Sequence, residues 1–194
     1  MDIINTLLLF DENKPSPSSF DVIIYTAGIL IASNLIFIVL CFIFKIDSNK
    51  TLEDEKDIEF AEWKKKNISP WSIAASEILN STIYSPIAEE IAFRLILMKF
   101  VCSKGLKMNN ITANILQSII FGLMHLSNSV YTTQTKKYTY LQTLSATISG
   151  LVSGWVYVKT NSLLPSLFAH MINNGAAGTT ELFSYISYLK KHPN

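Results

Sequence analysis

The sequence has little charge, and its second half has almost no acidic residues. Only 16% of the 194 residues are Asp, Glu, Lys or Arg, whereas about a quarter is usual in a soluble domain. After Lys66 the acidic residues that remain are Glu77, Glu89, Glu90 and Glu181. The net charge is only +1, so the chain lacks the basic excess that nucleic-acid binding requires. This depletion is typical of a membrane protein and argues against a nucleic-acid partner.

Cysteine is also scarce, and a secretory leader is not expected. Cys41 and Cys102 lie in or beside apolar runs, at no spacing used by metal or redox motifs. We interpret both as small buried apolar side chains, and they do not indicate a compartment. A signal peptide needs a basic region ahead of its apolar core. No basic residue precedes the apolar run at residues 7–10.

Long apolar runs are what the sequence has in abundance. Residues 22–44 are uncharged throughout and long enough to cross about 30 Å of hydrocarbon as a helix. About five such segments are separated by polar connectors. We therefore predict an all-α, polytopic transmembrane bundle in which the last four segments form a core that encloses a site. The five segments are residues 22–44, 71–100, 111–127, 138–158 and 165–189.

The chain divides into an N-terminal part and a core domain. Residues 1–69 hold a polar segment, the first transmembrane helix and a charged connector, and residues 70–189 form the core. The connector mixes charges with Ile58, Phe60 and Trp63. That pattern fits an interfacial amphipathic helix and fits a solvated loop equally well.

Two further patterns concern packing and orientation. The G-x-x-x-G spacing of Gly150 and Gly154 favours close approach of helices in a bilayer. If residues 22–44 run from outside to inside, ten lysines fall in inner segments and five in outer ones. The positive-inside rule then predicts an external N-terminus and an internal C-terminus.

Three ionisable side chains lie close together inside the second apolar segment. Charges at membrane depth cost several kcal/mol, so they are usually paired and functional. Glu90 and Arg94 are four residues apart, on one helix face, and we predict an ion pair between them. Glu89 lies about 100° round the helix from Glu90. It is therefore left to face a pocket.

Two later segments repeat the four-residue spacing. Phe121 and His125 share one helix face, and His170 and Asn174 share another. If these faces converge with that of Glu89, they can deprotonate a water and hold an oxyanion. Two histidines and a carboxylate are also a ligand set for zinc.

Each of these polar residues also has a structural interpretation. A single histidine can satisfy a neighbouring hydroxyl or carbonyl, and an asparagine can join two helices. The structural interpretation does not explain why three pairs recur with the same spacing. Glu77 and Glu181 belong to no such pair, and we expect them near a membrane surface or in a polar seam.

The same residues resemble the motifs of a known family. "EEIAFR" at 89–94 resembles E-E-x-x-x-R, "FGLMH" at 121–125 resembles F-x-x-x-H, and "HMINN" at 170–174 resembles H-x-x-x-N. In this order they are similar to the CPBP family of CAAX-protease and bacteriocin-processing membrane proteins, also called Abi. The resemblance covers roughly residues 70–180, and residues 1–69 show nothing specific.

The resemblance implies an intramembrane endopeptidase of the glutamic type. It would hydrolyse peptide bonds of a membrane-associated peptide or protein. By position, the resemblance implies that Glu89 acts with His125 to activate the attacking water. It implies that His170 and Asn174 stabilise the tetrahedral oxyanion.

Supporting roles in this scheme fall to Glu90, Arg94 and Phe121. No cofactor is implied, although the family was formerly described as metalloproteases, so a zinc-dependent hydrolysis is the second candidate. The chain is shorter than the eukaryotic CAAX-processing members, which weakens the expectation of a prenylated substrate. Small members are mainly bacterial and linked to bacteriocin immunity or peptide maturation. This predicts a multi-pass protein of a prokaryotic plasma membrane.

Two other classes of protein remain open. The first is a non-enzymatic membrane protein that confers immunity or binds a partner, in which the motif residues would be structural. The second is a small proton-coupled transporter, because intramembrane Glu and His can relay protons. No internal repeat of the kind many transporters show supports the second class.

Overall fold

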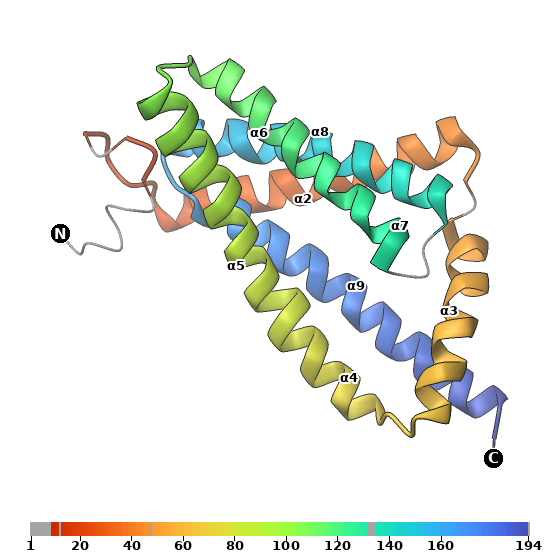
Figure 1. The fold of residues 1–194 in the computed structure, drawn as a ribbon. Coiled ribbons are helices and arrows are strands. Elements are labelled where there is room, and N and C mark those ends of the chain that lie inside the picture. Colours follow the sequence, from red (N-terminus) through yellow and green to blue (C-terminus); the bar gives the residue numbers. More distant parts are fainter. Residues whose placement is uncertain (1–8, 12, 47, 132–134, 194) are drawn as a thin grey trace.

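The computed structural model describes residues 9–11, 13–46, 48–131 and 135–193, and over these residues the chain is helical without strands. Figure 1 shows a bundle of long helices. The first is α2 (Ser19–Phe44). Its N-terminus is fixed by a capping box: the Ser18 hydroxyl accepts the N–H of Asp21 at 3.1 Å, and the Asp21 carboxylate accepts the N–H of Ser18 at 3.1 Å.

The second long helix runs without a break from residue 70 to residue 105 and changes its winding along the way. It consists of α4 (Pro70–Ser76), η1 (Glu77–Tyr84), α5 (Ser85–Glu90) and η2 (Ile91–Gly105). The two η segments are π-helical, so their hydrogen bonds join residues five apart. Such wide turns are rare and occur often at functional sites.

The remaining helices complete the bundle. After α3 (Ser48–Lys65) and the long helix come α6 (Asn110–Met124), the short η3 (His125–Ser127) and α7 (Asn128–Tyr131), α8 (Lys136–Thr160) and α9 (Leu164–Lys191). α8 packs against α6 and α2, and α9 packs against η1 and α2. In Figure 1, α9 lies side by side with the first half of the 70–105 helix, below the layer of α2, α6 and α8, and the second half of that helix rises to the level of α6.

Each predicted apolar segment is a helix, which confirms the all-α expectation. Among the described helices, only α2 is long and apolar enough, by length and mean hydropathy, to cross a membrane. Membrane crossing by the other four segments therefore stays a prediction.

The charged connector is a helix and not a loop. Phe60 of α3 packs against the rings of Tyr185 and Tyr188 of α9, with centroids 5.3 and 5.7 Å apart. Trp63 lies edge-on to Tyr185 at 5.3 Å. The side chain of Ile58 lies outside the described residues. This aromatic cluster fixes α3 against the C-terminal half of α9.

An ion pair runs beside that cluster. Lys56 Nζ lies 3.1 Å from the Glu181 carboxylate, so Glu181 sits in a polar seam between α3 and α9, as one of the two expected placements had it. The side chain of Glu77 lies outside the described residues.

Glycines allow α6 and α8 to approach closely. A Cβ at Gly154 would lie 1.9 Å from the Asn114 side chain, and one at Gly150 would lie 3.3 Å from Ser118. This confirms the prediction from the G-x-x-x-G spacing. Gly122 of α6 is also tightly packed, because a Cβ there would lie 1.8 Å from the Thr147 hydroxyl and 2.8 Å from the Thr143 carbonyl oxygen.

Contacts between connecting segments occur at two ends of the bundle. At one end, Lys64 Nζ donates to the His192 carbonyl at 2.6 Å, and the start of α8 lies at the same end in Figure 1. At the other end, Asn161 binds the N-terminal segment: its side chain accepts the Asp11 N–H at 2.6 Å and donates to the Asp11 carbonyl at 2.8 Å.

Candidate active site

The helix that carries the two adjacent glutamates contains Pro86, which removes one of its backbone hydrogen bonds. The N–H of Ser85 bonds to the Asn80 carbonyl five residues earlier, so the next carbonyl, that of Ser81, would need the N–H of residue 86. Proline has no N–H. The Asn174 side chain of α9 donates to the Ser81 carbonyl instead, at 2.9 Å. Asn174 thus replaces the missing backbone donor and links α9 to the segment that precedes Glu89 and Glu90.

Glu90 forms the ion pair that its spacing predicts. Arg94 Nε lies 3.3 Å from Glu90 Oε2, and the side chains are 2% and 1% exposed respectively. The guanidinium also lies over the Phe121 ring, 4.6 Å from its centroid, in a cation–π contact. Nη1 of Arg94 makes no hydrogen bond within the described chain. The pair is therefore a desolvated unit packed against an aromatic ring.

His170 of α9 connects the two glutamates. Its Nδ1 lies 3.1 Å from Glu90 Oε1, and its Nε2 lies 3.6 Å from Glu89 Oε2. Because a carboxylate can only accept, Nδ1 donates to Glu90. The second distance exceeds hydrogen-bond range. The imidazole thus has one nitrogen held by a hydrogen bond to Glu90 and one that lies near Glu89 without a hydrogen bond.

Glu89 differs from Glu90 in environment, as its helix position predicts. Its side chain is 29% exposed, and its Oε1 accepts a hydrogen bond from the Ser85 hydroxyl at 2.5 Å. Among the described residues, Glu89 makes no ion pair or hydrogen bond with His125. The imidazole that contacts it is that of His170.

His125 stands at the opposite side of the site, where α6 passes into η3. Its Nδ1 lies 3.0 Å from the Phe121 carbonyl oxygen, so Nδ1 carries a proton and donates. Nε2 is then free to accept when the ring is neutral. The Phe121 ring lies edge-on between the two histidines, 5.1 Å from His125 and 6.1 Å from His170 by ring centroids. The sequence pairing of Phe121 with His125 is thus a real contact.

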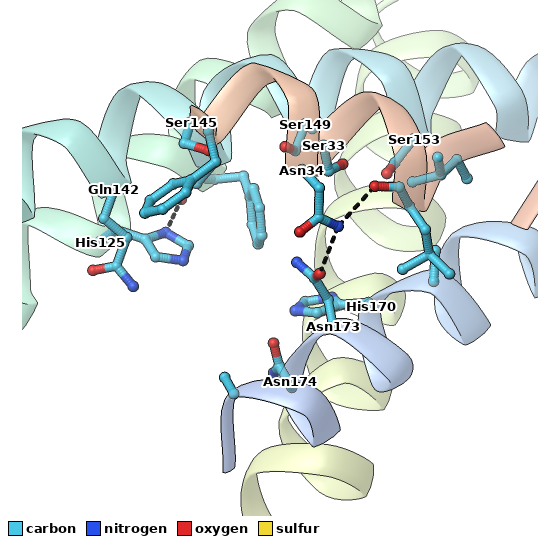
Figure 2. Close-up of a pocket in the computed structure, with 18 of the residues that line it drawn as sticks. Ser33, Asn34, His125, Gln142, Ser145, Ser149, Ser153, His170, Asn173 and Asn174 are labelled. Carbon is cyan, nitrogen blue, oxygen red and sulfur yellow. Dashed lines mark hydrogen bonds between the residues drawn. The ribbon is translucent and has the colours of Figure 1, made fainter. Parts of the chain in front are cut away.

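These side chains line one cavity of about 450 Å³, a size in the range of ligand pockets. Figure 2 shows His125 on one side and His170, Asn173 and Asn174 on another. Of the seven residues singled out from the sequence, six line the cavity: Glu90, Arg94, Phe121, His125, His170 and Asn174. Glu89 is not part of the lining and meets it through His170.

The sequence analysis missed a polar wall on the far side of the cavity. It is formed by Ser33 and Asn34 of α2 and by α8 residues that recur every three or four positions: Gln142, Ser145, Ser149 and Ser153. Their spacing on one helix face was the available signal. It was hidden because serine is common in apolar helices.

The donor set does not fit a zinc ion well. Within the described part of the chain, no group of three or more His, Cys, Asp or Glu is arranged to hold a metal. Glu90, the most buried carboxylate, already faces the Arg94 cation and the Nδ1–H of His170. A dication at Glu90 would meet the guanidinium charge at close range.

Comparison with known proteins identifies the core. A family model described as "Type II CAAX prenyl endopeptidase Rce1-like" matches residues 70–176, which is more than half of the chain. Searches among curated proteins and solved structures gave no match. The matched region begins with α4 and ends in α9 just beyond Asn174, so it contains every residue of the three motifs.

Proposed function

Because this chain belongs to the Rce1-like family of type II CAAX prenyl endopeptidases, we propose that it is an intramembrane endopeptidase of the glutamic type. The family implies a protease with a membrane-associated protein substrate. The observation that carries the proposal is the position of His170, between Glu89 and Glu90 on the wall of a cavity that His125 and Asn174 also line.

In the proposed mechanism, Glu89 and His125 activate the attacking water. Glu89 is the carboxylate that Arg94 does not neutralise, and it is partly exposed, so it can accept a proton. His125 has its Nε2 available because the Phe121 carbonyl holds Nδ1. Glu89 and His125 stand apart, so the proposal requires the water and the substrate to lie between them. Water adds to the peptide carbonyl, and the C–N bond then breaks as the amine takes up the proton.

His170 and Asn174 stabilise the negative charge that develops on the carbonyl oxygen. Nδ1 of His170 donates to Glu90, so in this mechanism the ring acts as an imidazolium, whose Nε2–H donates toward the reacting group. Asn174 uses one N–H for the Ser81 carbonyl and has a second. Donors placed beforehand at a developing oxyanion are commonly the largest contribution to such catalysis.

We also propose that the bundle crosses the membrane several times. α6 has a row of exposed apolar side chains four residues apart, Ile111, Ile115, Ile119 and Leu123, and Trp155 of α8 and Ile172 of α9 are also exposed. Contiguous apolar surface of this kind marks an interface with lipid or protein. The lysine distribution favours an orientation with the N-terminus outside and the C-terminus inside.

The test is cleavage of a membrane peptide by purified protein in lipid vesicles. Wild type should cleave, and Glu89→Ala and His125→Ala should each reduce turnover by at least a hundredfold, as loss of a general acid or base does. Undiminished turnover in either variant would remove that residue from the mechanism. A non-enzymatic immunity or binding protein should tolerate Glu89→Gln, whereas a general base should not.

The proposed hydrolysis needs no metal, and the zinc-dependent version is tested separately. Elemental analysis of purified protein and the effect of a chelator on turnover decide between them. Stoichiometric zinc that is lost together with activity would replace the glutamic mechanism by a metal-dependent one.

A further inference from the structure

The polar wall opposite the two histidines has no assigned role in the hydrolysis. Three serines of α8, Ser145, Ser149 and Ser153, line the cavity at four-residue spacing, and we name them the serine ladder. Figure 2 shows them along one helix, with Ser33 of α2 beside them and His170 across the cavity. Residues spaced by four lie on one face of a helix, about 6 Å apart along its axis.

The hydroxyls of the ladder differ from other helix hydroxyls of the described residues in their hydrogen bonding. Elsewhere in this chain, helix hydroxyls donate to the carbonyl four residues earlier, as those of Thr147, Thr160 and Ser184 do at 2.8–2.9 Å. Within the described residues the ladder serines make no side-chain hydrogen bond. The same holds for Ser33.

Burial makes these unpaired hydroxyls informative. Ser153 is 6% exposed and Ser33 is 9% exposed, and both line the cavity. Both side chains line the cavity and make no hydrogen bond within the described residues, so a polar group that enters the cavity can bind them. Nη1 of Arg94, also buried, is a further unpaired donor on the cavity wall.

From this juxtaposition we propose that the serine ladder binds the backbone of the substrate in an extended conformation and positions the scissile bond beside His170 and Glu89. The inference rests on the proposed function and names the positioning residues of that site. A peptide must leave its helical form before its carbonyl can be attacked. Within a membrane, the released N–H and C=O groups then need new partners.

The spacing of the ladder fits an extended peptide. In an extended chain, groups that point the same way recur every two residues, or about 6.6–6.8 Å, close to the 6 Å step of the ladder. A single water that bridges two successive hydroxyls would span about 5.6 Å, which also matches the 6 Å step. Water delivery is therefore the alternative outcome of the test.

The test combines serine variants with backbone-modified substrates. Ser149→Ala, Ser153→Ala and the double variant are compared with Ser184→Ala, whose hydroxyl bonds within α9 and does not line the cavity. Each is assayed on a cleavable membrane peptide and on analogues in which one amide N–H at a time, near the cleavage site, is replaced by an ester oxygen.

We expect each ladder variant to raise KM about three- to tenfold, the effect of one hydrogen bond, with kcat within about twofold. For one ester position, the losses from the ester and from the serine change should not add, because both remove the same bond. Ser149→Cys, which keeps the volume, should behave like Ser149→Ala. Ser184→Ala should match wild type.

Unchanged KM in the ladder variants, or strictly additive losses at every ester position, would overturn the proposal. A fall in kcat alone, equal for all substrates, would indicate water delivery and would also overturn it. If wild type cleaves no peptide, the proposed function is refuted, and the proposal for the ladder is refuted with it. These results are distinguishable because the wild-type rate is measured on every substrate.

Discussion

Replacement of Glu90 is expected to damage the fold before it damages the chemistry. Glu90 is 1% exposed and faces both Arg94 and His170. Glu90→Ala leaves the guanidinium buried without a counter-ion. Breaking a buried pair from one side costs on the order of 3–5 kcal/mol. In a domain of this size, each kcal/mol corresponds to about 2–4 °C in Tm, so Tm should fall by roughly 6–20 °C.

Two further variants separate charge from packing. Glu90→Leu combined with Arg94→Leu removes both charges, and it should recover much of the lost stability because no charge is left unpaired. Glu89→Gln is the matched control, since Glu89 is 29% exposed and its ion-pair contact within the described residues is with His170 and not with Arg94. Its Tm should stay within a few degrees of wild type.

The assay is thermal unfolding of the purified proteins in one detergent, followed by helical circular dichroism. A Tm for Glu90→Ala equal to that of wild type would refute the structural role of the ion pair. If the double variant has a lower Tm than Glu90→Ala, the unpaired charge is not the main cause of the lost stability. The buried ion pair would then stabilise the fold by more than two leucines do.

Three other predictions use the same unfolding measurement. Gly122→Ala should lower the free energy of unfolding by about 1–3 kcal/mol, because its Cβ would meet a backbone carbonyl of α8 at 2.8 Å. Gly28→Ala is the control: no atom lies within 4 Å of its Cβ, so it should be neutral or slightly stabilising. Equal effects of the two changes would contradict the packing argument. Phe60→Ala should cost about 3–5 kcal/mol and expose α3 to limited proteolysis; a wild-type digestion pattern would disprove the docking of α3 on α9. Asn174→Leu should cost about 1–3 kcal/mol, because the Ser81 carbonyl loses its donor; an unchanged Tm would show that donation from Asn174 to the Ser81 carbonyl does not stabilise the fold.

The sequence predicted those parts of the structure that depend on local spacing. The apolar runs predicted the five long helices, and the four-residue spacing predicted the ion pair of Glu90 and Arg94. Both follow from helix geometry alone. The close approach of α6 and α8 was predicted from Gly150 and Gly154 for the same reason.

The parts that depend on tertiary packing could not be predicted. His170 meets both glutamates because α9 lies beside α5, and eighty residues of chain separate the partners. The serines of the ladder become cavity-lining residues only because α2, α6 and α9 pack around them. The helical form of α3 was undecided because its charged sequence gains an apolar contact only from Tyr185 and Tyr188 of α9.

Pro86 shows a third kind of limit. From sequence, a proline inside an apolar run predicts a break or kink. The helix in fact continues, because the wide π turns shift the missing hydrogen bond to Ser81 and Asn174 replaces the donor. The compensation comes from Asn174, for which the sequence allowed both an oxyanion role and a hydrogen bond between two helices, but did not indicate Ser81 as the partner.

The central claim is that water, activated at Glu89, adds to a peptide carbonyl in this cavity. It is tested most directly by cleavage of a membrane peptide in vesicles prepared in ¹⁸O-enriched water, with mass spectrometry of both fragments. The account predicts one ¹⁸O atom in the new carboxylate with wild type and no cleavage with Glu89→Gln at an unchanged Tm. Wild-type cleavage that Glu89→Gln reproduces, with the same label, would contradict it.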